Sequence, residues 1–251
     1  MTAAFSPLLQ ELDAWAARGL TPRLWLRDDD AVADRPELRQ LLALCGAAAI
    51  PPTLAVIPAK IEASLEAALS RNTMPMPSLL VHGYAHVNHE GPKAKKAELG
   101  TARPLAEVAA DTAKGLALLH VAFPREALPV LVPPWNRVRP DLVPLLQDQG
   151  YEGISTFGPA CYAGLGIIEA NTHVDLMDWR ARRGRSIPDV IRNLTHTLQR
   201  QRAADPAEPV GILTHHAVHD EVAWSCLADL ADLVAGRVLW LSGREVFYAA
   251  P

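Results

Sequence analysis

Short apolar runs alternate along the chain with longer segments in which apolar residues recur every three or four positions. The short runs are typical of buried strands, and the longer segments are typical of amphipathic helices. The predicted strands are Leu24–Arg27, Thr53–Ile57, Leu79–Val81, Val130–Val132, Gly153–Phe157, Thr172–Leu176, Gly211–Thr214 and Val238–Leu241. The predicted helices are Pro36–Ala48, Ala59–Ser70, Leu105–His120, Pro140–Gln149, Pro188–Gln201 and Glu221–Val234.

This alternation of strands and helices indicates βαβ units, and therefore a parallel sheet. A chain of 251 residues suits one large α/β domain. We therefore predict a single domain over residues 1–251, an irregular (β/α)7–8 barrel. A doubly wound open sheet is the alternative that the pattern leaves open.

Polar residues gather where the predicted strands end. Aspartates 28 to 30 follow the first strand, and His82 follows the third. The segments 133–136, 175–179 and 215–216 follow later strands. In a β/α barrel the carboxyl ends of the strands form one rim, where catalytic groups converge. The sequence therefore predicts a functional site at this rim.

Two histidines at this rim, His82 and His86, are spaced as residues i and i+4. If one helical turn follows the strand, both imidazoles lie on the same side. Two histidines and one carboxylate can leave an open metal position for water, as in catalytic zinc sites. Three consecutive aspartates repel one another, and a cation would offset the repulsion between Asp29 and Asp30. These residue types together predict a metal centre.

Composition and charge narrow the classes of partner. There are 24 Lys and Arg against 28 Asp and Glu, a formal net charge of −4, so we expect no nucleic-acid partner. Three isolated cysteines argue against a disulfide framework or a thiolate zinc site. No run approaches the roughly 20 apolar residues that a membrane span needs, and the N-terminal segment resembles an amphipathic helix more than a signal peptide. We therefore expect a cytoplasmic protein.

Five segments in order resemble the motifs of the polysaccharide deacetylases, also called carbohydrate esterase family four. They are Arg27–Ala31, His82–His86, Val132–Asn136, Asp175–Trp179 and Leu213–His215. Each motif is weak alone, but five in the right order, spanning residues 27 to 215, are fairly specific. The resemblance implies a metal-dependent deacetylase whose divalent cation, zinc as the first guess, is held by Asp30, His82 and His86.

The resemblance also implies roles in proton transfer. Asp29 would be the general base and His215 the general acid, with Asp178 orienting His215. Trp135 and Trp179 would wall the acyl pocket, and a backbone N–H near Trp135 would help to hold the oxyanion. The predicted substrate-binding residues, in part aromatic side chains that can stack on sugar rings, are Tyr84, Trp135, Asn136 and Trp179.

One position departs from the family pattern. The third motif normally begins with an arginine that braces the catalytic base, and here that position is Val132. Residues two apart on a strand face the same side, so Arg27 can share a face with Asp29. Arg27 is therefore the predicted substitute, and Arg137 is the second candidate.

Other polar residues leave alternatives open. Only one residue of the His215–His216 doublet can face the barrel interior, and the resemblance favours His215. His89 is an alternative metal ligand or a solvated loop residue. The arginines at 180, 182, 183 and 185 are either solvated or grip a phosphate or carboxylate of the substrate.

The leading functional interpretation is a hydrolase that removes an N-linked acetyl group from an N-acetylated sugar, glycan or glycan precursor. A hydrolase of a small amide or a ring C–N bond is the second interpretation. A catalytically silent carbohydrate-binding protein on the same fold is the third. The sequence identifies neither the exact substrate nor an oligomeric state.

Overall fold

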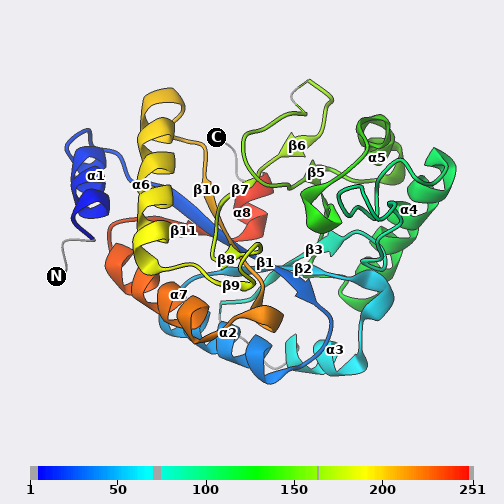
Figure 1. Cartoon of the computed structure of the whole chain (residues 1–251), viewed down its shortest axis with the longest axis horizontal. Helices are drawn as coiled ribbons and strands as arrows, with labels where there is room; N and C mark the ends of the chain where they lie inside the picture. The colour runs from blue at the N-terminus through cyan, green and yellow to red at the C-terminus, as the bar shows by residue number, and fades with distance from the viewer. Residues whose placement is uncertain (1–4, 70–74, 163, 249–251) are drawn as a thin grey trace.

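Parallel strands curl into a barrel in the computed structural model, which describes residues 5–69, 75–162 and 164–248 (Figure 1). Hydrogen-bonded neighbours follow the order β6-β5-β4-β3-β2-β1-β10-β7, and every pairing along this path is parallel. The strands are β1 (Arg23–Ala31), β2 (Pro52–Val56), β3 (Ser78–His82), β4 (Ala127–Val132), β5 (Gly153–Ile154), β6 (Ile168–Glu169), β7 (Thr172–Asp175) and β10 (Val210–Thr214).

The two ends of this order, β6 and β7, are consecutive in the chain, and together they close the ring. The N–H of Thr172 donates to the carbonyl of Thr156 at 3.0 Å, and the N–H of Gly158 donates to the carbonyl of Thr172 at 2.8 Å. Residues 172–175 then pair with β10 on the other side. The predicted irregular (β/α) barrel is therefore confirmed, and the open sheet is excluded.

Helices cover the outside of the barrel. They are α2 (Pro36–Ala47), α3 (Ala63–Leu69), α4 (Leu105–Ala122), α5 (Val143–Leu146), α6 (Ile187–Ala204) and α7 (Glu221–Val234). The predicted helix Pro140–Gln149 is broken into α5 between two short 3₁₀ turns, and the predicted helix Ala59–Ser70 begins as a 3₁₀ turn at Pro58–Lys60. Ser70 lies outside the described residues. None of the described helices is long and apolar enough to cross a bilayer.

Three further elements, at the two ends of the chain, pack onto the barrel. Helix α1 (Ser6–Ala16) packs against α6 through buried apolar side chains and an ion pair from Arg202 to Glu11. Strand β11 (Leu239–Leu241), predicted as Val238–Leu241, pairs with the start of β1. Helix α8 (Gly243–Tyr248) then plugs the amino-terminal end of the barrel, where Phe247 packs edge-on against Trp25.

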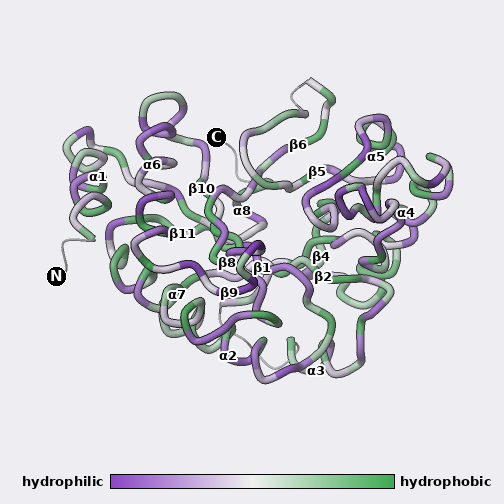
Figure 2. Tube along the Cα trace, viewed as in Figure 1, coloured by the Kyte–Doolittle hydropathy of each residue, from purple (hydrophilic) through white to green (hydrophobic). Residues whose placement is uncertain are grey.

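The barrel separates two apolar layers. The larger layer lies between the strands and the outer helices, and the smaller one fills the barrel next to α8. In Figure 2, hydrophobic stretches lie in central strands such as β2 and β4, whereas the hairpin of β8 (Met177–Asp178) and β9 (Arg183–Gly184) is largely hydrophilic. The apolar side chains inside the barrel end on the amino-terminal side of Arg27 and Asp29, so the carboxyl end of the barrel is polar. The polar end of the barrel therefore coincides with the rim at which the sequence predicts a site.

Candidate metal centre and active site

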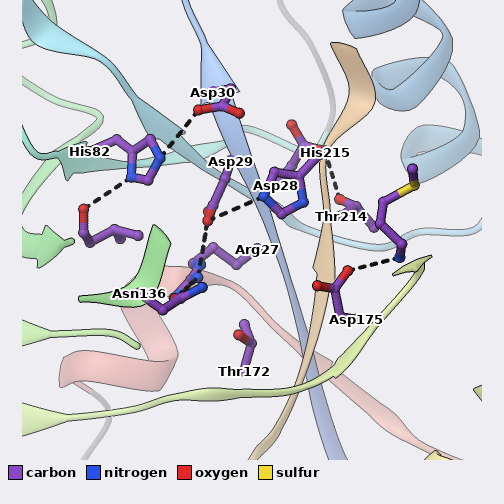
Figure 3. Close-up of polar contacts among 12 residues, drawn as sticks. Arg27, Asp28, Asp29, Asp30, His82, Asn136, Thr172, Asp175, Thr214 and His215 are labelled. Carbon is purple, nitrogen blue, oxygen red and sulfur yellow. Dashed lines mark hydrogen bonds and ion pairs between the residues drawn. The ribbon is translucent and has the colours of Figure 1, made fainter. Parts of the chain in front are cut away.

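The three consecutive aspartates of β1 face three different surroundings (Figure 3). Successive side chains of a strand alternate, so Asp29 shares a face with Arg27 while Asp28 faces the opposite way. Asp28 accepts a hydrogen bond from the hydroxyl of Thr214 at 2.7 Å. Asp30 has a left-handed φ of 74°, where the β1–β2 register shifts, and its carboxylate turns toward two histidines. This division separates charges that would otherwise repel one another.

Asp30, His82 and His86 form a group whose ligand atoms all lie within 4.8 Å of one another. The Oδ1 atom of Asp30 is 3.3 Å from Nε2 of His82 and 3.4 Å from Nε2 of His86. This oxygen is buried, and no other donor of the described residues reaches it. One carboxylate and two imidazole nitrogens directed at one point are a donor set that suits zinc and other first-row cations. These residues therefore fit the predicted metal.

The surroundings of the two imidazoles favour their role as ligands. The Nδ1 atom of His82 hydrogen-bonds the carbonyl of Val132 at 3.0 Å, which holds the ring with Nε2 toward Asp30. Burial, and secondly the charge of His82, lower the pKa of His86 to about 4. His86 is therefore neutral at pH 7, the form in which imidazole binds a metal. His89, the alternative ligand, is not part of this group.

A buried carboxylate holds the segment between the two histidines. Glu98 is 1% exposed and accepts the backbone N–H groups of Tyr84 at 3.1 Å and Ala85 at 2.7 Å. A side chain at Gly83 would put its Cβ 2.1 Å from a carboxylate oxygen of Glu98, and Gly83 also has a left-handed φ of 58°. Glycine is required there for both reasons. Sequence reasoning missed Glu98, because nothing in its local pattern distinguishes it from a surface glutamate.

Backbone strain concentrates at this rim. Among the described residues, six non-glycine residues have a positive φ, and four of them, Asp30, His86, Trp135 and Asn136, belong to the predicted site. Such conformations are unfavourable for residues with a Cβ and persist where surrounding structure enforces them. Clustering of such conformations is typical of functional sites, and here it coincides with the predicted site residues.

Arg27 contacts Asp29, as the sequence predicted. Its Nε donates to Oδ1 of Asp29 at 2.9 Å, and its Nη2 donates to Oδ2 at 3.1 Å. The remaining donors reach the Ser155 hydroxyl at 2.7 Å, the Thr156 carbonyl at 3.1 Å and Oδ1 of Asn136 at 2.8 Å. All five N–H groups are satisfied, which makes a fully buried guanidinium tolerable. Arg137, the second candidate, donates instead to the carbonyl of Lys96.

His215 and His216 follow the end of β10 at Thr214 and face opposite ways. The Nε2 atom of His215 lies 3.9 Å from Oδ2 of Asp29 (Figure 3). The ring of His215 also packs against Trp179 edge-to-face, with centroids 4.5 Å apart. The backbone N–H of His215 donates to His219 at 3.3 Å. The Nδ1 of His216 instead pairs with the buried carboxylate of Asp28. His215 is thus the member of the doublet that shares a space with Asp29.

This geometry predicts different consequences for the two histidines. His216→Ala is expected to lower the free energy of unfolding by at least about 2 kcal/mol, because Asp28 stays buried and loses a charged partner. Turnover per folded molecule should change little, whereas His215→Ala should abolish most of it. Denaturant titration combined with kinetics of the folded fraction separates these effects. Equal losses of turnover in both variants would remove the basis for choosing His215.

Asp178, the residue predicted to orient His215, lies on the hairpin of β8 and β9. Its carboxylate accepts the backbone N–H groups of Arg180 and Ala181, both at 3.1 Å, and so caps a turn at the surface. Asp175, three residues earlier, accepts from the indole N–H of Trp179 at 2.8 Å. Burial raises the pKa of Asp175 above its ordinary value, and the imidazole of His215 acts to lower it. The hairpin directs the Asp178 carboxylate to backbone N–H groups, and no described residue hydrogen-bonds Nδ1 of His215, so the orienting role of Asp178 stays a prediction.

The predicted substrate-binding residues are distributed around the rim. The Trp135 ring lies against His86, with centroids 4.3 Å apart, and Trp179 is 50% exposed beside His215. The amide oxygen of Asn136 accepts from Arg27, so Asn136 braces that guanidinium. The ammonium of Lys114 lies 4.7 Å over the ring of Tyr84. The two tryptophans therefore flank the centre, one beside the metal group and one beside His215.

Comparison with known proteins identifies the fold. No protein-family model and no curated protein sequence matches this chain. A family 4 carbohydrate esterase from Streptomyces lividans, solved in complex with acetate, superimposes with a TM-score of 0.56 at 16% identity, over 88% of this chain and 92% of that chain. A family 4 esterase from Streptococcus mutans gives 0.60 at 13% identity, over 95% and 90%. The chain has the fold of the family 4 carbohydrate esterases.

That fold also occurs without catalysis. A family 4 pseudoenzyme from Bacillus anthracis superimposes with a TM-score of 0.57 at 13% identity, over 91% of this chain and 66% of that chain. A fold does not define an activity, so the assignment of function depends on the side chains at the rim.

Proposed function

We propose that this chain is a metal-dependent hydrolase that removes an N-linked acetyl group from an N-acetylated sugar or glycan. The observation that carries the proposal is the meeting of Asp29 and His215, 3.9 Å apart, beside the Asp30–His82–His86 group. Structures that share the fold include an esterase bound to acetate and a peptidoglycan N-acetylglucosamine deacetylase, which supports this substrate class.

Asp30, His82 and His86 would hold a divalent cation, with zinc as the first choice for a carboxylate and two imidazoles. When bound, the cation supplies Lewis acidity, which polarises a carbonyl and makes water more acidic. Glu98 fixes the loop between the two histidines, so the ligand atoms are held in place before the cation arrives.

The residues around this group can perform the proton transfers of amide hydrolysis. Asp29 accepts a proton from the water whose oxygen bonds to the acyl carbon. His215, as imidazolium, donates a proton to the amide nitrogen, so the C–N bond breaks to give an amine and acetate. The N–H groups of Asn136 and Arg137 already bond Pro133 and Pro134, which leaves the N–H of Trp135 as the oxyanion donor of this turn.

The experiment that tests the proposal combines metal analysis with acetate release. Purified protein is assayed for bound zinc, manganese, cobalt and nickel, and then incubated with N-acetylglucosamine oligomers and with small N-acetyl amides. Acetate release from the sugars, abolished by a chelator and restored by the metal, is expected. Release from small amides alone would indicate the small-amide hydrolase. Full metal occupancy without release from any compound would indicate a silent binding protein.

Arg27 gives a prediction about the orientation of the base. Arg27→Lys should keep the fold and the metal but lower kcat by roughly 10- to 100-fold, because one ammonium cannot hold both carboxylate oxygens of Asp29 as a planar guanidinium does. Arg27→Met should lower kcat further. Kinetics, metal content and thermal unfolding measured together distinguish misorientation from unfolding. A lysine variant with unchanged kcat would show that the bidentate contact has no catalytic importance.

A further inference from the structure

A short antiparallel hairpin stands beside His215. Its strands are β8 (Met177–Asp178) and β9 (Arg183–Gly184). The Gly184 N–H donates to Asp220 at 2.9 Å, and a Cβ at Gly184 would lie 2.4 Å from the backbone nitrogen of Ala223, so the hairpin sits directly on the start of α7. At its other end Trp179 packs on His215 and donates to Asp175. The hairpin is therefore fixed at the proposed active site.

This hairpin concentrates positive charge in an acidic protein. Residues 178–185 contain four arginines and one aspartate, a net charge of +3, whereas the whole chain carries −4. Arg180, Arg182 and Arg183 are exposed, and hydrophilic positions gather where β8 and β9 lie (Figure 2). The one carboxylate, Asp178, lies opposite Arg183 in the pairing, and its pKa is lowered first by the backbone N–H of Ala181. Most of the local charge is therefore uncompensated.

The described arginines divide into those that form ion pairs and those that do not, and six arginines outside the hairpin are also without an ion pair: Arg18, Arg23, Arg125, Arg137, Arg200 and Arg244. Eight of the described arginines form ion pairs with carboxylates: Arg27, Arg35, Arg39, Arg103, Arg139, Arg192, Arg202 and Arg237. Within residues 5–69, 75–162 and 164–248, no carboxylate forms an ion pair with Arg180, Arg182 or Arg183. Unpaired guanidiniums at the mouth of a site attract anions and can bind a phosphate or carboxylate through paired N–H groups.

We infer that the substrate is an N-acetylated sugar that also carries an anionic group, phosphate or carboxylate, which the hairpin arginines bind. Trp179 adds the second half of the recognition, because its half-exposed indole offers an apolar face for a sugar ring next to His215. The ring would then stack on Trp179 with its acetamido group toward Asp29 and its anion toward Arg180, Arg182 and Arg183. This inference rests on the proposed deacetylase function and specifies its substrate class.

The test measures binding separately from turnover. Metal-loaded Asp29→Asn protein is titrated by calorimetry with N-acetylglucosamine 6-phosphate, N-acetylmuramic acid and neutral N-acetylglucosamine. At least one anionic sugar is expected to bind roughly tenfold or more tightly than the neutral one, as several charge-assisted contacts at an exposed site would give. The phosphate and carboxylate probes identify which anion is preferred. Equal affinity for all three sugars, or no measurable binding of any, would overturn the inference.

Variants that remove arginine charges then test whether the hairpin causes the tighter binding of anionic sugars. Arg180→Gln/Arg182→Gln/Arg183→Gln should remove it while leaving affinity for the neutral sugar unchanged. The matched control, Arg18→Gln/Arg125→Gln/Arg200→Gln, removes the same charge from exposed positions that precede β1, precede β4 and lie on α6, and should retain it. A preference that survives the hairpin variant, or is lost equally in the control, contradicts the assignment. Intact binding preference without acetate release by the natural chain would instead contradict only the proposed function.

Discussion

Asp29→Asn is expected to lower kcat by about 10²- to 10⁴-fold, because the amide cannot accept the proton of the attacking water. The metal content should stay at one ion per chain, since Asp29 lies beside the Asp30–His82–His86 group and is not a member of it. Steady-state acetate release and metal analysis of the same preparation measure both quantities. Unchanged turnover in this variant would contradict the assignment of Asp29 as the base.

Asp178→Asn is the matched control for this prediction. It makes the same chemical change in a half-buried carboxylate that caps a turn, and it should leave turnover close to that of the natural chain. A large loss in this variant would support the role that the motif resemblance gives to Asp178. Asp175→Asn, by contrast, should lower turnover, because it removes a charge that acts on His215.

His82→Ala is expected to abolish stoichiometric metal binding. It removes one of three ligands, and His82 is the ligand whose orientation is fixed by a hydrogen bond to Val132. The measurement is metal content after dialysis, together with a dissociation constant from competition with a chelator. Full metal content in this variant would show that the ligand assignment is wrong.

His89→Ala provides the comparison. His89 follows His86 by three residues and lies outside the ligand group, so this variant should bind metal as the natural chain does. A weakened affinity in His89→Ala would instead indicate that the loop rearranges to bring His89 to the cation.

The alternation of apolar runs and helical patterns was sufficient to predict the barrel, because a parallel sheet with helical crossovers is what such a pattern can bury. It did not predict how the ring closes. Strands β6 and β7 close the ring together. The hydrogen bonds of Thr172 to residues 156 and 158 form only because a long loop returns the chain to the neighbouring strand. The last predicted strand, Val238–Leu241, pairs with the start of β1, and Phe247 of α8 packs among the apolar side chains inside the barrel.

Contacts between residues close in sequence were also predictable. Arg27 and Asp29 are two apart on one strand, and His82 and His86 are four apart, so local geometry alone puts each pair on one side. The contact of Arg27 with Asp29 that followed from this reasoning is present. The same reasoning correctly required His215 and His216 to face opposite ways.

What the sequence by itself determined, then, is the order of the elements, the type of barrel, and the residues that share a face within one strand or turn. The tertiary structure decided which groups, distant in sequence, become the partners of the polar and charged residues at the rim. Asp28 is paired with His216, 188 residues away, Glu98 holds the loop between the histidine ligands, and Asp175 accepts from the indole of Trp179. Periodicity is fixed by neighbouring residues along the chain, whereas a buried charge takes its partner from whichever strand or loop the closed barrel brings against it.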